Sequence, residues 1–380
     1  MSAKHKIVIA GSGGIGRAVA LMIRELGDFE ADIYMGDAEE GRAAEATHWV
    51  ADGSSSLLGR IEAFKMPREG SSRDFDAILE GADVLLDCLP GEQSPRMARL
   101  ARKFKTHYAN MTEYVKETEE IVKIADGADK GFVLQTGLAP GFIDVLGLWL
   151  YRQFCRHFGV DIVDSISLKV GALPQSSFPP HFYGFTWSRI GVATEYIKPA
   201  VVIRDFEKCT RPSLSERATV IIKGVTYEED LTSGGIADLP DALTGKTRSL
   251  EYKTLRYPNH YAWIDSILAS IPQGENPILY LDRKIEEEIP FVEDDIVVIF
   301  ASVQGKDREG RLRLIERSYY IEPMKIGNRS LRAIQATTAA PMAECARMLL
   351  HGHFSGVILQ SRIDPLEFMK GLFVNAVYKM

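Results

Sequence analysis

The chain has 380 residues, which is more than one compact core usually holds and enough for two or three domains. Hydrophobic residues make up 46% and charged residues 26%, which excludes a disordered chain, a collagen-like fibre and a coiled-coil rod. A formal net charge of -7 offers no positive field for a polyanion, so nucleic acid is not expected as a main partner.

Apolar segments are short throughout the chain. No run approaches the ~20 residues that span a bilayer, and the start, Met-Ser-Ala-Lys-His-Lys, does not resemble a signal peptide. The cysteines form no C-x-x-C pair, which is typical of reduced thiols and argues against disulfides and a metal site. They are Cys88, Cys155, Cys209 and Cys345. We therefore expect a cytoplasmic protein that binds neither a membrane nor a metal ion.

The first third alternates short apolar runs with helical patterns, as βαβ units with a parallel sheet do. We predict strands at residues 6–10, 32–35, 60–64, 83–88, 107–109 and 131–135. We predict helices at residues 17–26, 94–104 and 113–125.

The middle of the chain is richer in β patterns, and the tail is helical. We predict strands at residues 166–170, 201–203, 220–225, 249–255 and 296–303, and helices at 338–350 and 365–374. The polar segment 305–310 predicts an antiparallel hairpin between 296–303 and 312–321. The fold class is therefore α/β: a Rossmann-type doubly wound parallel sheet with a second α+β domain built on an antiparallel sheet.

A glycine-rich turn directly follows the first predicted strand and directly precedes the first helix. It reads Gly11-Ser12-Gly13-Gly14-Ile15-Gly16 and fits the G-x-G-x-x-G pattern of dinucleotide-binding turns. Gly11 permits the tight turn, Gly13 lets backbone N–H groups approach a pyrophosphate, and Gly16 lets helix and strand pack closely. The helix N-terminus then supplies N–H donors and a partial positive charge to the diphosphate.

Asp37 lies just after the second strand, where an acidic residue binds the hydroxyl groups of the adenosine ribose. Its charge would repel a 2′-phosphate, so we predict NAD as the cofactor, with NADP as the alternative. FAD is less well supported, because no second flavin-type signature is present. Cys88, Leu89 and Pro90 end the fourth strand, and we expect them beside the cofactor, with Cys88 as a wall and not a nucleophile.

A second turn, Thr136-Gly137-Leu138-Ala139-Pro140-Gly141-Phe142, follows the last strand of this region. Pro140 at a first helical position would again offer N–H groups to an anion. A plain domain-boundary turn explains the same residues equally well.

Further stretches follow in a characteristic order. After the glycine turn they are Gly137-Leu138-Ala139-Pro140-Gly141, Thr186-Trp187-Ser188 with Glu195-Tyr196, Thr232-Ser233-Gly234-Gly235, Lys253-Thr254-Leu255-Arg256-Tyr257-Pro258, Ala333-Ile334-Gln335-Ala336-Thr337-Thr338-Ala339 and Gly356-Val357. From Lys6 to about residue 370, the chain thus resembles the saccharopine dehydrogenase and lysine 6-dehydrogenase-like family.

The resemblance implies a Rossmann domain, a catalytic domain and C-terminal helices that return to the Rossmann domain. We accordingly predict domains at 1–137, 138–335 and 336–380. It also implies NAD(P)-dependent oxidation at a carbon that bears nitrogen, or the reverse reductive amination, in a homodimer. Saccharopine-specific members commonly carry Asp where this chain has Ala139, and the Ala-Pro-Gly form is more similar to the lysine 6-dehydrogenase branch. Members often have Gly where this chain has His260.

An amino-acid substrate carries carboxylates, which the planar fork of arginine binds bidentately. Arg189 is our first candidate for this contact and Arg256 our second, although each also fits a surface salt bridge. Tyr183 lies in an aromatic loop that forms either a substrate wall or ordinary core.

A base near neutral pH would deprotonate the amine, which nominates His181 and His260, unless these histidines are structural. We therefore predict an NAD(P)-dependent oxidoreductase that acts on the CH–NH bond of an amino acid or its adduct, of the saccharopine or lysine type. The alternatives are a carboxynorspermidine-type reductive condensation and a redox-silent dinucleotide-binding sensor.

Overall fold

The computed structural model describes residues 4–56, 59–113 and 115–379. The chain divides into two compact units, which we describe separately. The first unit comprises Met1–Phe142, Met324–Leu331 and Gln335–Met380, and the second comprises Ile143–Pro323 and Arg332–Ile334.

The first unit is built on a parallel sheet with the strand order β17-β6-β5-β4-β1-β2-β3. The central strand β1 is buried along most of its length, as its uninterrupted apolar run requires. The strands are β1 (His5–Ala10), β2 (Ala31–Asp37), β3 (Ile61–Lys65), β4 (Val84–Asp87), β5 (His107–Asn110), β6 (Gly131–Val133) and β17 (Gly356–Ile358). The last strand, β17, comes from the tail and extends the sheet beside β6.

Side-chain caps begin two helices of this unit, α3 and α12. In α3, the Ser72 hydroxyl accepts a hydrogen bond from the Phe75 N–H, and in α12 the Asp364 carboxylate caps Leu366 and Glu367. The helical segments of this unit are α1 (Gly14–Leu26), α2 (Glu40–Gly53), α3 (Arg73–Leu79), η1 (Gly91–Gln93), α4 (Ser94–Lys103), α5 (Val115–Ile124), most of α11 (Ala333–His351), η2 (Gln360–Arg362), α12 (Pro365–Met369) and α13 (Leu372–Tyr378). A two-stranded sheet joins β15 (Met324–Ile326) to β16 (Arg329–Leu331).

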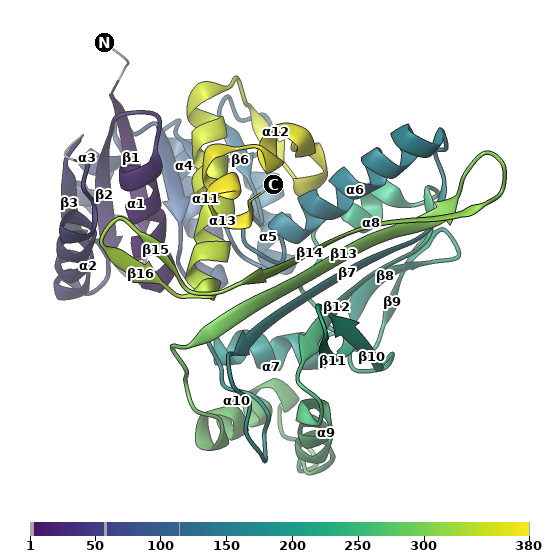
Figure 1. The fold of residues 1–380 in the computed structure, drawn as a ribbon. Helices are drawn as coiled ribbons and strands as arrows, with labels where there is room; N and C mark the ends of the chain where they lie inside the picture. The colour runs from purple at the N-terminus through teal and green to yellow at the C-terminus, as the bar shows by residue number, and fades with distance from the viewer. Residues whose placement is uncertain (1–3, 57–58, 114, 380) are drawn as a thin grey trace. The chain divides into compact units, whose positions relative to one another are not determined.

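The second unit is built on an eight-stranded mixed sheet. Its main path is β10-β11-β12-β7-β13-β14, and β8 pairs with both β12 and β9. The long strands β7, β13 and β14 run side by side in Figure 1. The strands are β7 (Val163–Pro174), β8 (Ala200–Arg204), β9 (Glu207–Arg211), β10 (Ala218–Ile222), β11 (Val225–Leu231), β12 (Thr247–Arg256), β13 (Asp295–Lys306) and β14 (Leu312–Ile321).

Helix α6 (Phe142–Phe158) packs closely on this sheet at Gly147. A Cβ at this position would lie only 2.9 Å from the Leu168 side chain. The helices of the unit are α6 (Phe142–Phe158), α7 (Arg189–Ile197), α8 (Leu239–Leu243), α9 (His260–Ala269) and α10 (Pro277–Glu288). No helix in the part of the chain that the structure describes is long and apolar enough to cross a membrane.

The predicted fold class is confirmed, with three corrections. The second sheet is not purely antiparallel, because β12 runs parallel to β7. Residues 220–225 are not one strand but a hairpin, since Lys223 and Gly224 both adopt positive φ and turn the chain. The predicted helix 365–374 is two helices, divided near Gly371. Tyr114, within the predicted helix 113–125, lies outside the described residues.

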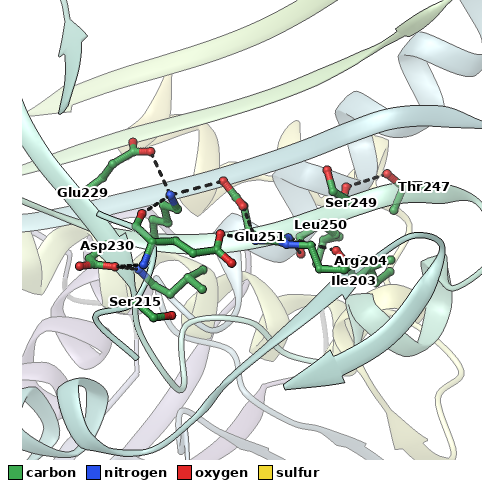
Figure 2. A network of polar contacts seen from close by, with 12 residues as sticks. Ile203, Arg204, Ser215, Glu229, Asp230, Thr247, Ser249, Leu250 and Glu251 are labelled. Carbon is green, nitrogen blue, oxygen red and sulfur yellow. Dashed lines mark hydrogen bonds and ion pairs between the residues drawn. The ribbon is translucent and has the colours of Figure 1, made fainter. Parts of the chain in front are cut away.

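A buried network of charges crosses the sheet of the second unit (Figure 2). Lys169 on β7 and Lys253 on β12 are 7% and 6% exposed, and both ammonium groups face Glu229 on β11, at 2.5 Å and 3.6 Å. Arg204 continues the network to Glu251, at 2.7 Å. Charged groups are tolerated in the interior only when each has a partner. Glu229 is a partner to one lysine on each of two strands.

We expect Glu229→Gln to lower the free energy of unfolding by about 3 kcal/mol, because it leaves a buried ammonium group without its carboxylate. Urea denaturation followed by circular dichroism measures this loss. Glu287→Gln is the matched control, since Glu287 pairs with Lys284 at the surface and its loss should change little. Equal effects of both substitutions would show that the buried network contributes nothing special.

Candidate functional site

The glycine-rich turn is held by two close approaches of backbone to backbone. Gly11 has a φ of +100°, and a Cβ there would lie 2.8 Å from the Cys88 carbonyl oxygen. A Cβ at Gly16 would lie 1.9 Å from the Gly11 carbonyl oxygen. Both positions therefore require glycine for the fold itself.

Gly13 differs from these two glycines, because a Cβ there would meet nothing within 4 Å. It is the N-cap residue of α1 and offers no side chain to the first N–H groups of that helix. These donors therefore open onto free space at a helix N-terminus, which is the arrangement that binds a diphosphate.

Asp37 ends β2 with its carboxylate fixed beside the turn. Its Oδ2 accepts a hydrogen bond from the Ser12 N–H at 3.2 Å, and its Oδ1 accepts one from the Glu39 N–H at 3.1 Å. Only 8% of the residue is exposed, so the carboxylate has little freedom to move.

A pocket of about 490 Å³ joins most of the predicted cofactor residues at the carboxyl ends of β1, β2 and β4. Its walls include Gly11, Gly13, Asp37, Cys88, Leu89 and Pro90. Ser12 is buried behind them, and Gly14, Ile15 and Gly16 form the first turn of α1. This lining, with a glycine turn, a helix N-terminus and an acidic residue, is typical of a dinucleotide site.

Cys88 lines this pocket. Burial, with the nearby charge of Asp87, raises the pKa of the Cys88 thiol far above its ordinary value. The group is therefore a neutral thiol and a poor nucleophile at neutral pH.

In the second unit, Arg256 lies at the end of β12 with only 1% of the residue exposed. Its Nε donates to the Tyr196 hydroxyl at 2.6 Å, and its Nη1 donates to the Leu255 carbonyl at 3.0 Å. The guanidinium lies 4.7 Å from the centre of the Tyr183 ring, a cation–π contact. Nη2 makes no hydrogen bond among the described residues, and the Glu195 carboxylate is 3.9 Å away.

Arg256, Tyr183 and Tyr196 form what we call the arginine cluster. His260 is fully buried against it, and its hydrogen bonds determine which ring nitrogen carries the proton. Nδ1 faces the His181 carbonyl at 2.8 Å, which only an N–H can satisfy, so Nε2 is the acceptor. The Tyr196 hydroxyl, 3.1 Å from Nε2, therefore donates to His260 and accepts from Arg256. Burial and the Arg256 charge lower the pKa of His260 to about 3. The geometry thus gives His260 a structural role and not that of a base near neutral pH.

The remaining candidates have other partners. His181 Nε2 lies 3.4 Å from Glu288, and its ring meets Trp263 edge-on. Arg189 begins α7 and forms ion pairs with Glu286 and Asp282 on α10. The structure therefore gathers Tyr183, Arg256 and His260, with the His181 backbone, around Tyr196.

Tyr196 was missing from the residues predicted as catalytic. Its only signal in the sequence was its place in the stretch Glu195-Tyr196, which supported the resemblance but suggested no role. Its function as a bridge between Arg256 and His260 depends on α7 meeting β12 and α9, which no local pattern encodes.

Residues 7–133 match the family described as "Saccharopine dehydrogenase NADP binding domain". This match is confined to the first unit, which is thus similar to the NADP-binding domain of saccharopine dehydrogenases.

The individual proteins that are similar to this chain are distant from it in sequence. The mitochondrial alpha-aminoadipic semialdehyde synthase of Mus musculus is 22% identical over 202 residues, which cover 53% of this chain. The match spans 20% of that longer relative.

Two solved structures share the fold along almost the whole chain. The apo saccharopine dehydrogenase (L-Glu forming) of Saccharomyces cerevisiae superimposes with a TM-score of 0.70, at 16% identity and 96% coverage of each chain. The homospermidine synthase of Legionella pneumophila in complex with NAD gives a TM-score of 0.69, at 15% identity, covering 99% of this chain and 91% of that one.

We expect Gly13→Ala to affect NAD binding and Gly16→Ala to affect stability. Gly13 has a φ of -70°, so alanine fits without strain, but its methyl group occupies the space before the helix N-terminus. Gly13→Ala should therefore keep the melting temperature and weaken NAD binding by at least about tenfold in calorimetry.

Gly16→Ala should instead lower the stability by about 3 kcal/mol, because its Cβ collides with the Gly11 carbonyl. A destabilised Gly13→Ala protein, or one that binds NAD normally, would contradict the assignment of the diphosphate to Gly13.

We also expect His260 to make stability depend on pH. Between an ordinary pKa of 6.5 and the folded pKa of about 3, only the unfolded chain binds the proton. Its contribution to stability is therefore complete above pH 6.5 and decreases as the pH falls, with a slope of up to about 1.4 kcal/mol per pH unit.

Denaturation at a series of pH values should show this slope for the wild type and lose it in His260→Gln. His157→Gln, at an exposed histidine, is the control and should keep the slope. Identical pH profiles for the wild type and His260→Gln would contradict a neutral buried imidazole.

Proposed function

We propose that this protein is an NAD-dependent oxidoreductase that acts on the CH–NH bond of an amino acid or an amino-acid adduct, of the saccharopine or lysine type. The proposal is supported by the family match, by the pocket around Gly13 and Asp37, and by the arginine cluster of the second unit. The fold shared with the yeast saccharopine dehydrogenase is consistent with it.

The observation that carries the proposal is a pair of buried donors that make no hydrogen bond with the described residues. Arg256 Nη2 and the Tyr183 hydroxyl make no hydrogen bond among the described residues, although the two residues are 1% and 4% exposed. A buried donor left unpaired costs about 1–3 kcal/mol, which a folded protein rarely tolerates without a reason. A substrate carboxylate would accept from both groups.

Arg256 is better prepared than Arg189 to bind that carboxylate. Tyr196 fixes its Nε and a backbone carbonyl fixes its Nη1, so its remaining edge is already oriented. Arg189 would first have to leave Glu286, and we therefore propose that it joins α7 to α10. Arg256 replaces Arg189 as the first candidate for the carboxylate contact.

The reaction needs a neutral amine, an oriented carbon and a hydride acceptor. The residues around Gly13 and Asp37 would hold the dinucleotide, which would supply the hydride acceptor for the substrate carbon. Arg256 and Tyr183 would orient the substrate, which can supply a large part of the rate enhancement. His181, beside Glu288, remains the proposed base that takes the amine proton.

We also propose a role for each of the three predicted domains. Residues 1–137 would hold the cofactor, residues 138–335 would bind the substrate, and residues 336–380 would complete the cofactor domain. We further propose that the protein forms a homodimer and acts in the cytoplasm.

A second candidate is a reductive condensation in polyamine synthesis, of the carboxynorspermidine type. It is favoured by the fold shared with the homospermidine synthase of Legionella pneumophila. Such an enzyme handles a diamine, which calls for carboxylates in the substrate site, whereas the unsatisfied groups here are a guanidinium and a hydroxyl. A redox-silent dinucleotide sensor would leave these buried donors unexplained.

The purified protein should reduce NAD with saccharopine or lysine as the substrate, which absorbance of the reduced nicotinamide measures. Tyr183→Phe should raise KM by about tenfold with little change in melting temperature, because the deleted hydroxyl meets the geometric criteria for no hydrogen bond with the described residues. Tyr227→Phe, at a buried tyrosine in another cluster, is the matched control and should keep the KM.

Turnover only with mixtures of a diamine and an aldehyde would replace this function with the second candidate. Binding of NAD without turnover of any of these substrates would support the sensor. An unchanged KM in Tyr183→Phe would remove the proposed carboxylate contact.

A further inference from the structure

The ribose end of the cofactor pocket carries more charge than one carboxylate. Besides Asp37, the pocket is lined by Glu39, Arg42 and Arg68, all outside the glycine turn. Glu39 is the N-cap residue of α2, and Arg42 lies one helical turn further along the same helix. Arg68 lies beyond the end of β3.

Glu39 binds both arginines, one at each carboxylate oxygen. Arg42 Nη2 donates to Glu39 Oε2 at 3.2 Å, and Arg68 Nη2 lies 3.8 Å from Glu39 Oε1. Arg42 Nη1 also lies 4.0 Å from Asp37 Oδ1. Two guanidinium groups are thus held beside the acid that faces the adenosine ribose.

These four charges cancel. Two carboxylates and two guanidinium groups leave the ribose end without the positive charge that a 2′-phosphate, with nearly two negative charges, would need. The side chains of Glu39, Arg42 and Arg68 are 57%, 55% and 79% exposed, so these pairs are weak and the arginines can change partners.

Asp37 and Glu39 differ in what else they do. Both oxygens of Asp37 accept backbone N–H groups, so removing that carboxylate also loosens the turn. The side chain of Glu39 caps no backbone group of α2, so its carboxylate can be removed without loss of a helix cap.

We propose that Glu39 masks a 2′-phosphate subsite formed by Arg42 and Arg68, and that it sets the cofactor preference for NAD together with Asp37. Without the Glu39 carboxylate, both guanidinium groups become available to a phosphate. Arginine forks bind phosphate bidentately, which makes this pair suitable for the task. The proposal rests on the dinucleotide-binding function of the first unit.

The test is calorimetric titration of the full-length protein with NAD and with NADP, which measures binding without turnover. Glu39→Gln should tighten NADP binding by about tenfold and change NAD binding by less than about threefold. The gain should shrink at high salt, because it comes from exposed charges.

Glu40→Gln is the matched control. It removes the same charge one residue further along, at a side chain that does not line the pocket, and should leave the NADP-to-NAD ratio unchanged. Glu39→Gln combined with Arg42→Met should lose most of the gain, because one of the two guanidinium groups is gone.

An NADP-to-NAD ratio equal in Glu39→Gln and Glu40→Gln would overturn the proposal, as would a gain that survives Arg42→Met. Melting temperatures of all variants check that the fold is intact. If the wild type binds neither nucleotide, the cofactor function itself fails, which is a different result from an unchanged ratio.

Discussion

The first unit depends on how closely backbone can approach backbone at the end of β1. Gly11 lies against the Cys88 carbonyl at the end of β4, and Gly16 lies against the Gly11 carbonyl. These two contacts bring the ends of neighbouring parallel strands and the start of α1 to one edge of the sheet. Because the helix begins there without a side-chain cap, its N–H donors remain for a ligand. The site that we propose for a diphosphate is thus a consequence of the packing that the glycines permit.

The second unit depends on the opposite constraint, the cost of burying charge. Lys169 and Lys253 are buried in its sheet because Glu229 reaches both of them. Arg256 is buried, and it donates one hydrogen bond to Tyr196 and one to a backbone carbonyl. The sheet network is balanced, because Glu216 adds a third carboxylate 2.6 Å from Arg204. In the arginine cluster, one edge of the guanidinium and the Tyr183 hydroxyl make no hydrogen bond among the described residues. This contrast distinguishes a charge network that stabilises the fold from one that is prepared for a ligand.

The candidate cofactor residues lie together around one pocket, whereas the candidate substrate residues are divided between separate contacts, and the reason is distance along the chain. The glycine turn and Asp37 lie within one βαβ unit, where local patterns determine the geometry. The substrate candidates came from composition and resemblance, and their partners lie far away in sequence. Tyr196 bonds to His260 across 64 positions and to Arg256 across 60, so no local pattern could identify it. His260 fitted a base by residue type, but its burial beside a guanidinium lowers its pKa to about 3.

By itself the sequence determined the class of fold, the dinucleotide turn and most of the strands, because each depends on periodicity or on glycine at fixed spacing. It did not determine that β12 runs parallel to β7, since apolar alternation is the same in parallel and antiparallel pairs. It also did not determine which arginine is oriented for a substrate. Arg189 and Arg256 are chemically identical, and only the tertiary structure gives one of them a surface carboxylate and the other a buried tyrosine. The burial and the partners of a charged group decide its role, and both are properties of the folded chain.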